Sequence, residues 1–396
     1  GQNYNGRYYP SFSGTAQSFN FYPVSYMKRD EGVVHLALGL GRTIANGEKS
    51  LRISPKYPGI LPQYYSIKAA LESSQNTFYA MDLSPKAHPL FNGEEKNLSS
   101  YNLEIAETDG SLKWSGSTIS NEDNVIRDSL SYDGTRVITF APVLKWATLP
   151  LVDILKDLIS MGKEALGCEV EIEFAVNIFD DPNKKPEFAL LQIKPMVMGG
   201  SREIINIEEG SDHEILCSSK ITLGDGLIND VRHIVFVDPK LFKPAITKDI
   251  AKEIHAINQT LIKKHPYILV GPGRWGSADS WLGVPVNWEQ INGASAIVEL
   301  GKNNFPVDPS FGSHFFQNVT SMRLGYFTVD HKSNTDVFDF SWLNKQIIND
   351  DKTYTTCYKL ELPLRIKIDG TTGNGVILKP KVPELEPMNE QETSGI

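Results

Sequence analysis

The feature that most constrains the fold is a strand-turn-strand pattern at residues 170–195, VEIEFAVNIFDDPNKKPEFALLQIKP. Apolar and polar residues alternate in both halves, and a polar turn that contains proline separates them. Alternation with a period of two predicts β-strands, and the turn between them predicts a hairpin. Each strand is therefore expected to have one apolar face, which packs on a core, and one polar face.

Polar side chains of the two strands are expected to meet. If the hairpin is symmetric about its turn, Glu173 lies opposite Gln192 and Glu171 lies opposite Lys194. Cross-strand neighbours on one face have Cβ atoms about 5 Å apart. Two interpretations follow. One is a solvated face, in which such ion pairs contribute less than about 1 kcal/mol; the other is a Mg-nucleotide site, because hard cations prefer carboxylate and amide oxygens.

A family resemblance points to the second interpretation. The runs E-I-E-F and L-L-Q-I-K-P of this hairpin resemble the D-I-E-W/F and L-Q-A-R-P signature that closes the ATP-grasp nucleotide domain of phosphoenolpyruvate synthases and pyruvate phosphate dikinases. The resemblance implies bound ATP and Mg2+, with Glu171, Glu173, Gln192 and Lys194 at cofactor-binding positions. Glu173 and Gln192 stand at the metal-binding positions. Lys194 replaces the family's arginine, which keeps the charge but loses the bidentate donor geometry.

Residues 1–58 carry a second part of the same resemblance. Their order of turn, strand, glycine turn and short helix is similar to the family's S-G-V-A-F-T-R-N-P … G-L-G-E block, with matching residues at Ser13-Gly14, Gly39-Leu40-Gly41 and Gly47. In the family this block belongs to the C-terminal half of the ATP-grasp domain, and a preceding half supplies further Lys and Arg contacts to ATP. We therefore expect a fragment, whose partners include a missing N-terminal lobe and other domains of a longer chain.

An alternative phosphate-binding motif lies in residues 41–50, GRTIANGEKS, which nearly spell a Walker A loop. The motif has five residues between its glycines and a Glu before its Lys. A cradle of backbone amides tolerates little change in length. An ordinary strand-to-helix turn is the simpler interpretation.

The stretch between these blocks changes character. Short apolar runs alternate with polar turns in residues 59–148, which predicts a β-rich excursion from the lobe. Residues 149–166 have apolar residues at helical spacing, and Gly167 is expected to end that helix. The helix leads directly into the hairpin, which is the order found in the family.

A second structural unit follows the hairpin. Residues 233–239 read as a strand, a helix begins at Thr247 with apolar residues on one face, and residues 267–273 read as the next strand. This order predicts a βαβ unit with parallel strands. Trp342, Cys357 and the KLELPLRIKI run are expected to form a closing β segment.

The sequence Gly271-Pro-Gly-Arg-Trp-Gly276 is a G-x-G-x-x-G motif placed directly after a predicted strand, and Glu299 ends the strand after it. In a Rossmann-type nicotinamide enzyme, a helix follows this motif and its N-terminus holds the pyrophosphate. Here Trp281, Gly283 and Pro285 break the next segment. A structural turn is therefore preferred over a dinucleotide site.

Residues 294–325 resemble the swivelling phosphohistidine domain of the same family, through ASAIV, the Ser-His pair at His314 and the later Leu324-Gly325, where a helix is expected to end. The resemblance implies that His314 is the catalytic phosphocarrier. A histidine beside a serine at a helix N-terminus is well placed to carry a phosphoryl group, because the amides and the helix dipole stabilise negative charge there. The alternative is a histidine that only caps or packs.

Composition excludes several classes of protein. A net charge of −9 and a pI near 5.5 argue against a nucleic-acid partner, which requires a basic surface. No apolar run approaches the length of a membrane span, and no targeting signal is present, so no membrane partner is expected. Three widely spaced cysteines predict neither a disulfide framework nor a zinc site, which favours a cytoplasmic location.

Together these observations predict a mixed α/β (α+β) chain. Residues 1–200 form an ATP-grasp-like nucleotide lobe, residues 201–380 a phosphohistidine-like α/β domain, and residues 381–396 a disordered, Pro/Glu-rich tail. The expected function is the ATP-binding part of a phosphotransferase that resembles phosphoenolpyruvate synthase, passing phosphate from ATP to a histidine and on to pyruvate or a related acceptor. The alternative is a non-catalytic binding module of the same fold.

Overall fold

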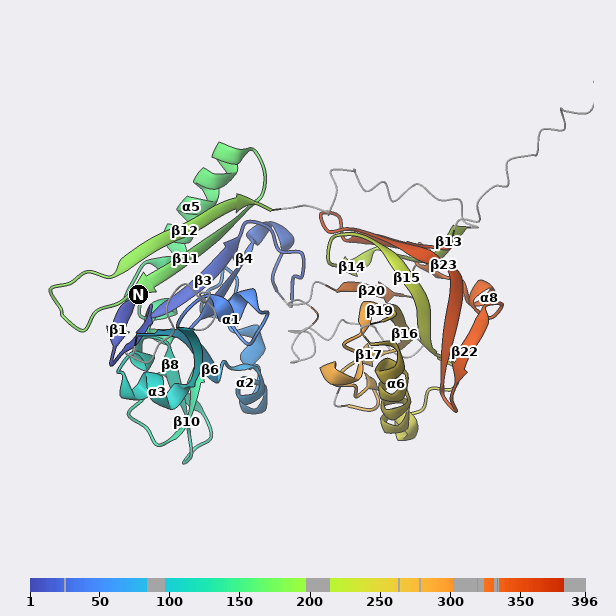
Figure 1. Cartoon of the computed structure of the whole chain (residues 1–396), viewed down its shortest axis with the longest axis horizontal. Helices are drawn as coiled ribbons and strands as arrows, with labels where there is room; N and C mark the ends of the chain where they lie inside the picture. The colour runs from blue at the N-terminus through green and yellow to red at the C-terminus, as the bar shows by residue number, and fades with distance from the viewer. Residues whose placement is uncertain are drawn as a thin grey trace, which may run out of the picture.

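The structure is a computed structural model, and it describes residues 1–83, 97–196 and 214–380, apart from residues 25, 263, 278, 302–318, 320–323, 331, 332 and 334. Two lobes of mixed α/β structure lie side by side (Figure 1). The first lobe comprises residues 1–196 and the second residues 214–380. His314 and the predicted tail at residues 381–396 lie outside the described residues.

The predicted hairpin forms one side of a five-stranded antiparallel sheet in the first lobe. Its strands, in spatial order, are β12 (Glu187–Pro195), β11 (Val170–Asn177), β3 (Phe12–Gln17), β4 (Val33–Ala37) and β5 (Leu51–Ile53). The apolar face of this sheet includes Ile172 and Phe174, which are buried in the core of the lobe. Helix α5 (Leu151–Leu166) packs on β11 and ends where Gly167 adopts a left-handed conformation, as the sequence predicts.

Smaller elements complete the first lobe. Two further sheets contain β1 (Gln2–Tyr4), β2 (Arg7–Tyr9), β6 (Thr77–Asp82) and β7 (Leu98–Asn102), and β8 (Gly116–Ser120), β9 (Ile126–Arg127) and β10 (Gly134–Ile138). The short helices are α1 (Arg42–Ala45), α2 (Ile67–Ser73), α3 (Leu103–Thr108) and α4 (Ala141–Leu144). The 3₁₀ turns are η1 (Arg29–Glu31), η2 (Pro62–Tyr64) and η5 (Leu112–Trp114). Residues 59–148 are therefore rich in strands, as predicted, but they also hold helices that the turn pattern did not indicate.

The second lobe is built on one large mixed sheet. Its main path is β14 (Ile221–Leu223), β20 (Gly325–Val329), β19 (Ala294–Leu300), β16 (Tyr267–Pro272), β15 (Gly226–Val237), β23 (Thr355–Asp369), β24 (Asn374–Leu378), β13 (Ile215–Ser219) and β21 (Val337–Phe338), with β22 (Ile347–Asp351) paired to β23. The central strands β15, β16, β19 and β20 are parallel. Helix α6 (Thr247–Leu261) connects β15 to β16 and buries its predicted apolar face. The predicted parallel βαβ unit is confirmed.

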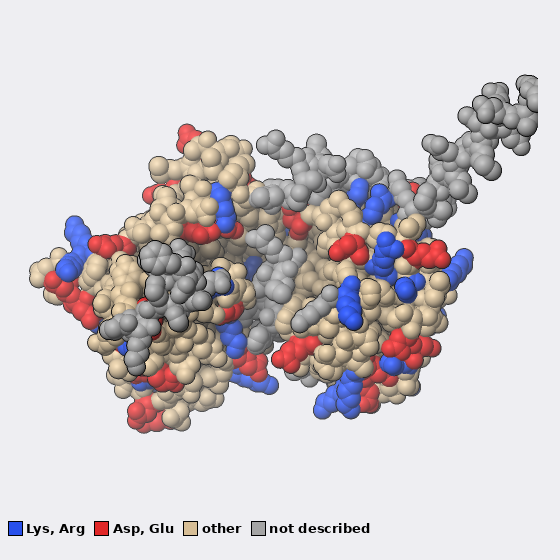
Figure 2. Space-filling model, in the orientation of Figure 1, with Lys and Arg blue, Asp and Glu red and all other residues tan. Residues whose placement is uncertain are grey.

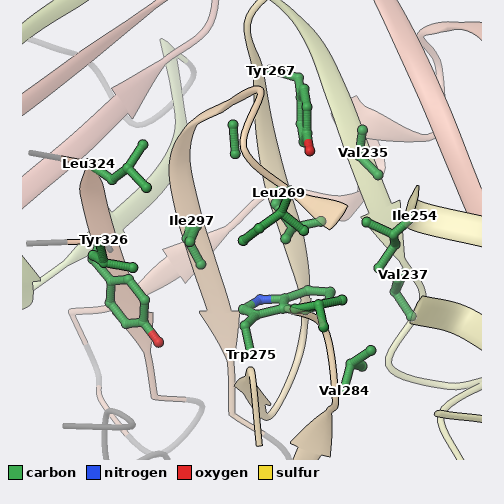
Figure 3. Close-up of a cluster of buried hydrophobic side chains, with 14 of the residues drawn as sticks. Val235, Val237, Ile254, Tyr267, Leu269, Trp275, Val284, Ile297, Leu324 and Tyr326 are labelled. Atoms are coloured by element: carbon green, nitrogen blue, oxygen red, sulfur yellow. The ribbon is translucent and has the colours of Figure 1, made fainter. Parts of the chain in front are cut away.

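Trp275 lies at the centre of the second lobe's core. It belongs to β17 (Arg274–Trp275), which pairs with β18 (Gly283–Val284), and its side chain is fully buried. Figure 3 shows the indole ring among apolar side chains from several elements, including Val237, Leu269, Val284 and Ile297. The remaining short elements are η7 (Pro244–Ile246), η8 (Trp288–Gln290) and α8 (Phe340–Leu343).

Some predicted boundaries in the second lobe are wrong. Strand β15 begins at Gly226 rather than near residue 233, because its first half pairs with the long strand β23. Gly325 begins β20, and nearly all of the segment expected to form a helix before it lies outside the described residues. Trp342 lies in α8, whereas Cys357 and the KLELPLRIKI run form β23 as predicted.

A loop of the first lobe joins the two lobes. Residues 18–32, which we call the strap, connect the neighbouring strands β3 and β4 and pack against the second lobe. Within the strap, Val24 and Met27 are buried in the core cluster of the second lobe. Arg29 donates from Nη1 to the carbonyl of Gly370 and from Nη2 to the carbonyl of Thr222, both at 2.6 Å.

Candidate functional site

A row of polar side chains crosses the five-stranded sheet on the face opposite its apolar core. The strand register aligns one residue from each strand, in the order Gln192, Glu173, Thr15, His35 and Arg52. We call these five residues the polar row. The predicted pairing of Glu173 with Gln192 and of Glu171 with Lys194 is confirmed. The regular register ends after Glu173, where a β-bulge shifts Phe174 opposite Leu190.

Lys194 bridges the two acidic residues of β11. Its Nζ lies 2.8 Å from Oε1 of Glu171 and 2.8 Å from Oε1 of Glu173. The hydrogen bond to Glu171, and then that to Glu173, raises the pKa of the Lys194 ammonium above its ordinary value. The Glu171 side chain is 13% exposed, and those of Glu173 and Lys194 are 38% and 41% exposed. This end of the face is therefore open to solvent.

Gln17 extends the same polar surface onto the next strand. It lies opposite Glu171 in the register of β3 and β11, and its Nε2 donates to Oε2 of Glu171 at 2.5 Å. Carboxylates, amides and an ammonium group therefore gather on three neighbouring strands. These are oxygen ligands for a hard cation and donors for an anion.

The opposite end of the polar row is buried and positively charged. Arg52 is 7% exposed and donates from Nη2 to Oδ1 of Asn20 at 2.8 Å and to the carbonyl of Tyr22. Burial lowers the pKa of Arg52 to about 10, so its guanidinium stays charged at neutral pH. Burial, and then the Arg52 charge, lowers the pKa of His35 to about 3, against the opposing effect of Glu171, so the imidazole stays neutral.

Sequence reasoning found one end of this row and missed the other. Glu171, Glu173, Gln192 and Lys194 are brought together as predicted. His35 and Arg52 were not singled out. The available signal was a single polar residue in the middle of each of two otherwise apolar strands, V-V-H-L-A and L-R-I.

The donor set for a metal ion is incomplete in the described part of the chain. Nowhere in the described ranges do three or more His, Cys, Asp or Glu side chains gather as a metal-binding group. Glu171 and Glu173 supply carboxylates, and the position between them is taken by the Lys194 ammonium. A Mg2+ ion fits these residues only if Lys194 turns away to another anion, such as a phosphate.

The Walker-like motif does not form a phosphate loop. Helix α1 begins directly after Gly41 and ends at Ala45, and the Lys49-Ser50 pair that closes the motif leads into strand β5. In a true loop of this kind the lysine and hydroxyl residue open a helix. The strand-to-helix turn predicted in its place is confirmed.

The G-x-G-x-x-G motif is also a structural turn. Strands β17 and β18 and the short η8 follow β16 where a dinucleotide fold has a helix. The amide of Trp275, within the motif, donates to Oε1 of Glu299 at 3.0 Å. The Tyr326 hydroxyl donates to the same oxygen. An internal carboxylate thus accepts the hydrogen bond of this backbone amide of the motif.

Glu299 is itself unusual, because it is fully buried. Its Oε2 atom has no hydrogen-bond partner among the residues that the structure describes. Burial raises the pKa of Glu299 to about 7, although the hydrogen bonds from Tyr326 and Trp275 oppose the shift. The carboxyl group therefore titrates near neutral pH. Figure 3 shows its hydrogen-bond donor Tyr326 at one side of the core cluster, near Ile297 and Leu324.

The surface gives no simple electrostatic indication of a partner. Figure 2 shows acidic and basic side chains interspersed over both lobes on the viewed face. Across the described ranges, no helix has the length and apolar character needed to cross a bilayer. The polar row is therefore the strongest candidate site in the described part of the chain.

A comparison with protein-family models and with curated proteins found none that matches this chain.

Proposed function

We propose that the first lobe binds the phosphate groups of Mg-ATP on the polar face of its five-stranded sheet. The observation that carries the proposal is the convergence of Glu171, Glu173, Gln192 and Lys194 on one open sheet face, at positions that match the nucleotide-binding signature of the phosphoenolpyruvate synthase family. The antiparallel sheet, with α5 leading into the hairpin, supports an arrangement like the C-terminal half of an ATP-grasp domain.

In this proposal each residue has a defined role. Glu173 and Gln192 supply oxygens to the metal ion, and Mg2+, when bound, neutralises phosphate charge. Lys194 leaves its carboxylate partners and donates to a phosphate oxygen. Gln17 keeps Glu171 oriented through its Nε2 hydrogen bond. A lysine contacts phosphate as a point charge, without the two parallel hydrogen bonds that an arginine makes.

The proposal includes a phosphotransferase reaction, in which the phosphoryl group of ATP passes to His314 and then to pyruvate or a related acceptor. The test is incubation of the full-length protein with β- or γ-labelled ATP. Acid-labile phosphate is expected on His314 and is expected to disappear in His314→Asn. Normal labelling of that variant would remove His314 from the reaction.

A binding module without catalysis is the second candidate. It is favoured by the ion-paired state of the face, since Lys194 compensates both Glu171 and Glu173. The phosphotransferase and the binding module differ in whether phosphate is transferred. A binding module binds Mg-ATP but transfers no phosphate to the protein.

Calorimetric titration of Mg-ATP into wild type and Glu173→Gln tests the binding proposal. Loss of a metal-coordinating charge is expected to weaken binding by about 1 to 3 kcal/mol. Glu187→Gln is a matched control, because Glu187 lies on β12 and accepts a hydrogen bond from Asn177 at 3.2 Å, away from Lys194. Equal affinities for wild type and Glu173→Gln would show that Glu173 does not bind the metal ion, and would favour the interpretation of the hairpin as a solvated face.

A further inference from the structure

Arg52 is a buried cation that has no carboxylate partner among the residues that the structure describes. Among the residues that the structure describes, Arg52 in the first lobe and Glu299 in the second are the Asp, Glu, Lys or Arg residues that are buried as whole residues. No carboxylate in the described ranges forms an ion pair with Arg52. Its acceptors are the amide oxygen of Asn20 and the carbonyl of Tyr22, which are both neutral. Buried charges in proteins are normally paired, because removing a charge from water without compensation is costly.

Part of the Arg52 guanidinium is also left without a hydrogen bond. Its Nε atom is buried and donates to no acceptor in the described part of the chain. Charge-assisted hydrogen bonds from guanidinium groups to phosphate oxygens are strong, and the unused Nε–H of Arg52 is a donor that an oxyanion would satisfy. His35, the neighbour of Arg52 in the polar row, is neutral, so it supplies no negative charge to the guanidinium.

Arg29 provides a contrast within the same chain. It is also substantially buried and also donates to backbone carbonyls. However, Asp369 and Asp225 lie close enough to raise its pKa, although burial outweighs them and lowers it overall. Arg29 is therefore compensated by carboxylates, whereas no described carboxylate plays this part for Arg52.

We propose that Arg52 forms the inner end of an anion-binding site that takes a phosphate group of a polyphosphate ligand on the polar face. The inference extends the nucleotide site proposed above, and it rests on that function for the identity of the ligand as a polyphosphate. Glu173 and Arg52 lie on β11 and β5, which are three strand spacings apart, or about 14 Å. An elongated phosphorylated ligand spans this distance, whereas a single phosphate ion reaches only the Arg52 end.

The test uses inorganic phosphate and tripolyphosphate as probes, in buffer with EDTA and without Mg2+, so that the metal contacts of Glu173 do not contribute. Affinity is measured by calorimetry and by the rise in melting temperature. Wild type is expected to bind both anions, with tripolyphosphate the tighter. Arg52→Gln is expected to lose at least tenfold in affinity for both, and Arg52→Lys to recover part of the loss because it restores the charge.

Arg29→Gln is the matched control. It removes a half-buried arginine that donates to carbonyls, so it is expected to lower the melting temperature without changing the affinity for phosphate. A merely structural role for Arg52 predicts the same result for Arg52→Gln. Unchanged phosphate affinity in Arg52→Gln, or no phosphate binding by the wild type, would overturn the inference.

Hydrogen exchange covers the case in which Arg52→Gln does not fold. Wild type with tripolyphosphate is expected to show slower exchange in peptides covering β5 and residues 20–22 of the strap; unchanged exchange there counts against the site. The outcome is separable from that of the proposed function. If Mg-ATP binding depends on Glu173 but not on Arg52, this inference is wrong and the proposed function stands. If the protein binds phosphate through Arg52 but does not bind Mg-ATP, the nucleotide proposal is wrong and this inference stands.

Discussion

The ammonium group of Lys194 lies 2.8 Å from Oε1 of Glu173, although the hairpin register places Gln192 opposite Glu173. Lys194 reaches diagonally along the face and contacts Glu171 at the same distance. One cation therefore compensates two carboxylates. That arrangement makes opposite predictions for a metal ion alone and for a metal ion that arrives with phosphate.

Replacing Lys194 with glutamine is expected to separate these two cases. The free divalent cation, probed with Mn2+, should bind more tightly, because the competing ammonium is gone and the two carboxylates repel each other. Mg-ATP should bind more weakly, by about 1 kcal/mol or more, because a phosphate contact is lost. Electron paramagnetic resonance of Mn2+ and calorimetry of Mg-ATP measure the two effects. Lys163→Gln is the control, since Lys163 pairs with Glu169 at 2.7 Å, outside the polar row. Weaker Mn2+ binding in Lys194→Gln would contradict the view that the Lys194 ammonium competes with a metal ion.

Glu299 makes stability depend on pH. Its folded-state pKa of about 7 lies above the ordinary value of 4.5, so its contribution to stability is fully present below about pH 4.5 and is lost as pH rises to 7. The shift corresponds to roughly 3 kcal/mol. Glu299→Gln stays neutral, so its stability relative to wild type should rise by that order between pH 5 and pH 8. Urea unfolding at several pH values measures it, and parallel pH profiles for the two proteins would refute the assignment.

Gly14 is expected to tolerate no side chain. A Cβ atom there would collide with the ring of Phe174 and lie 2.7 Å from the carbonyl oxygen of His35. Gly14→Ala should therefore cost about 1 to 3 kcal/mol through overpacking. Gly41→Ala is the control, because the nearest atom to its Cβ position is Oγ of Ser13 at 3.7 Å and its φ of −62° suits alanine. Chemical denaturation compares them, and equal stabilities would argue against the steric account.

Loss of the Arg29 side chain is expected to loosen the contact between the lobes. Arg29→Met removes two charge-assisted hydrogen bonds to the second lobe, each worth about 1.5 to 3 kcal/mol. Faster proteolytic cleavage in the strap is expected, together with a lower melting temperature. Arg127→Met, which breaks an exposed ion pair with Asp123, should change neither. An unchanged cleavage rate in Arg29→Met would show that the apolar contacts of the strap suffice.

The sequence predicted the hairpin register because alternation fixes which side chains share a face. The prediction held from Val170 to Glu173 and then failed at the bulge, since one extra residue on a strand leaves no periodic signal. Parallel strands around α6 were predictable from the apolar spacing of the helix and the length of the crossover.

The buried end of the polar row was beyond sequence reasoning for a different reason. His35 and Arg52 are adjacent only because β4 and β5 pair, and the partners of Arg52 come from the strap. A single polar residue in a short apolar strand does not indicate which polar groups will surround it. The neutral surroundings of Arg52, as far as the described residues show them, arise from three segments brought together by folding.

The strap also bears on how the chain reaches its folded state. Strands β3 and β4 pair with each other, yet the loop between them places Val24 and Met27 inside the core of the second lobe. A nascent first lobe would expose those two side chains until residues beyond 214 had been synthesised. We expect residues 1–196 produced alone to aggregate, because the surface that buries the strap belongs to the other half. The two lobes, although their sheets are separate, are therefore expected to depend on each other for folding.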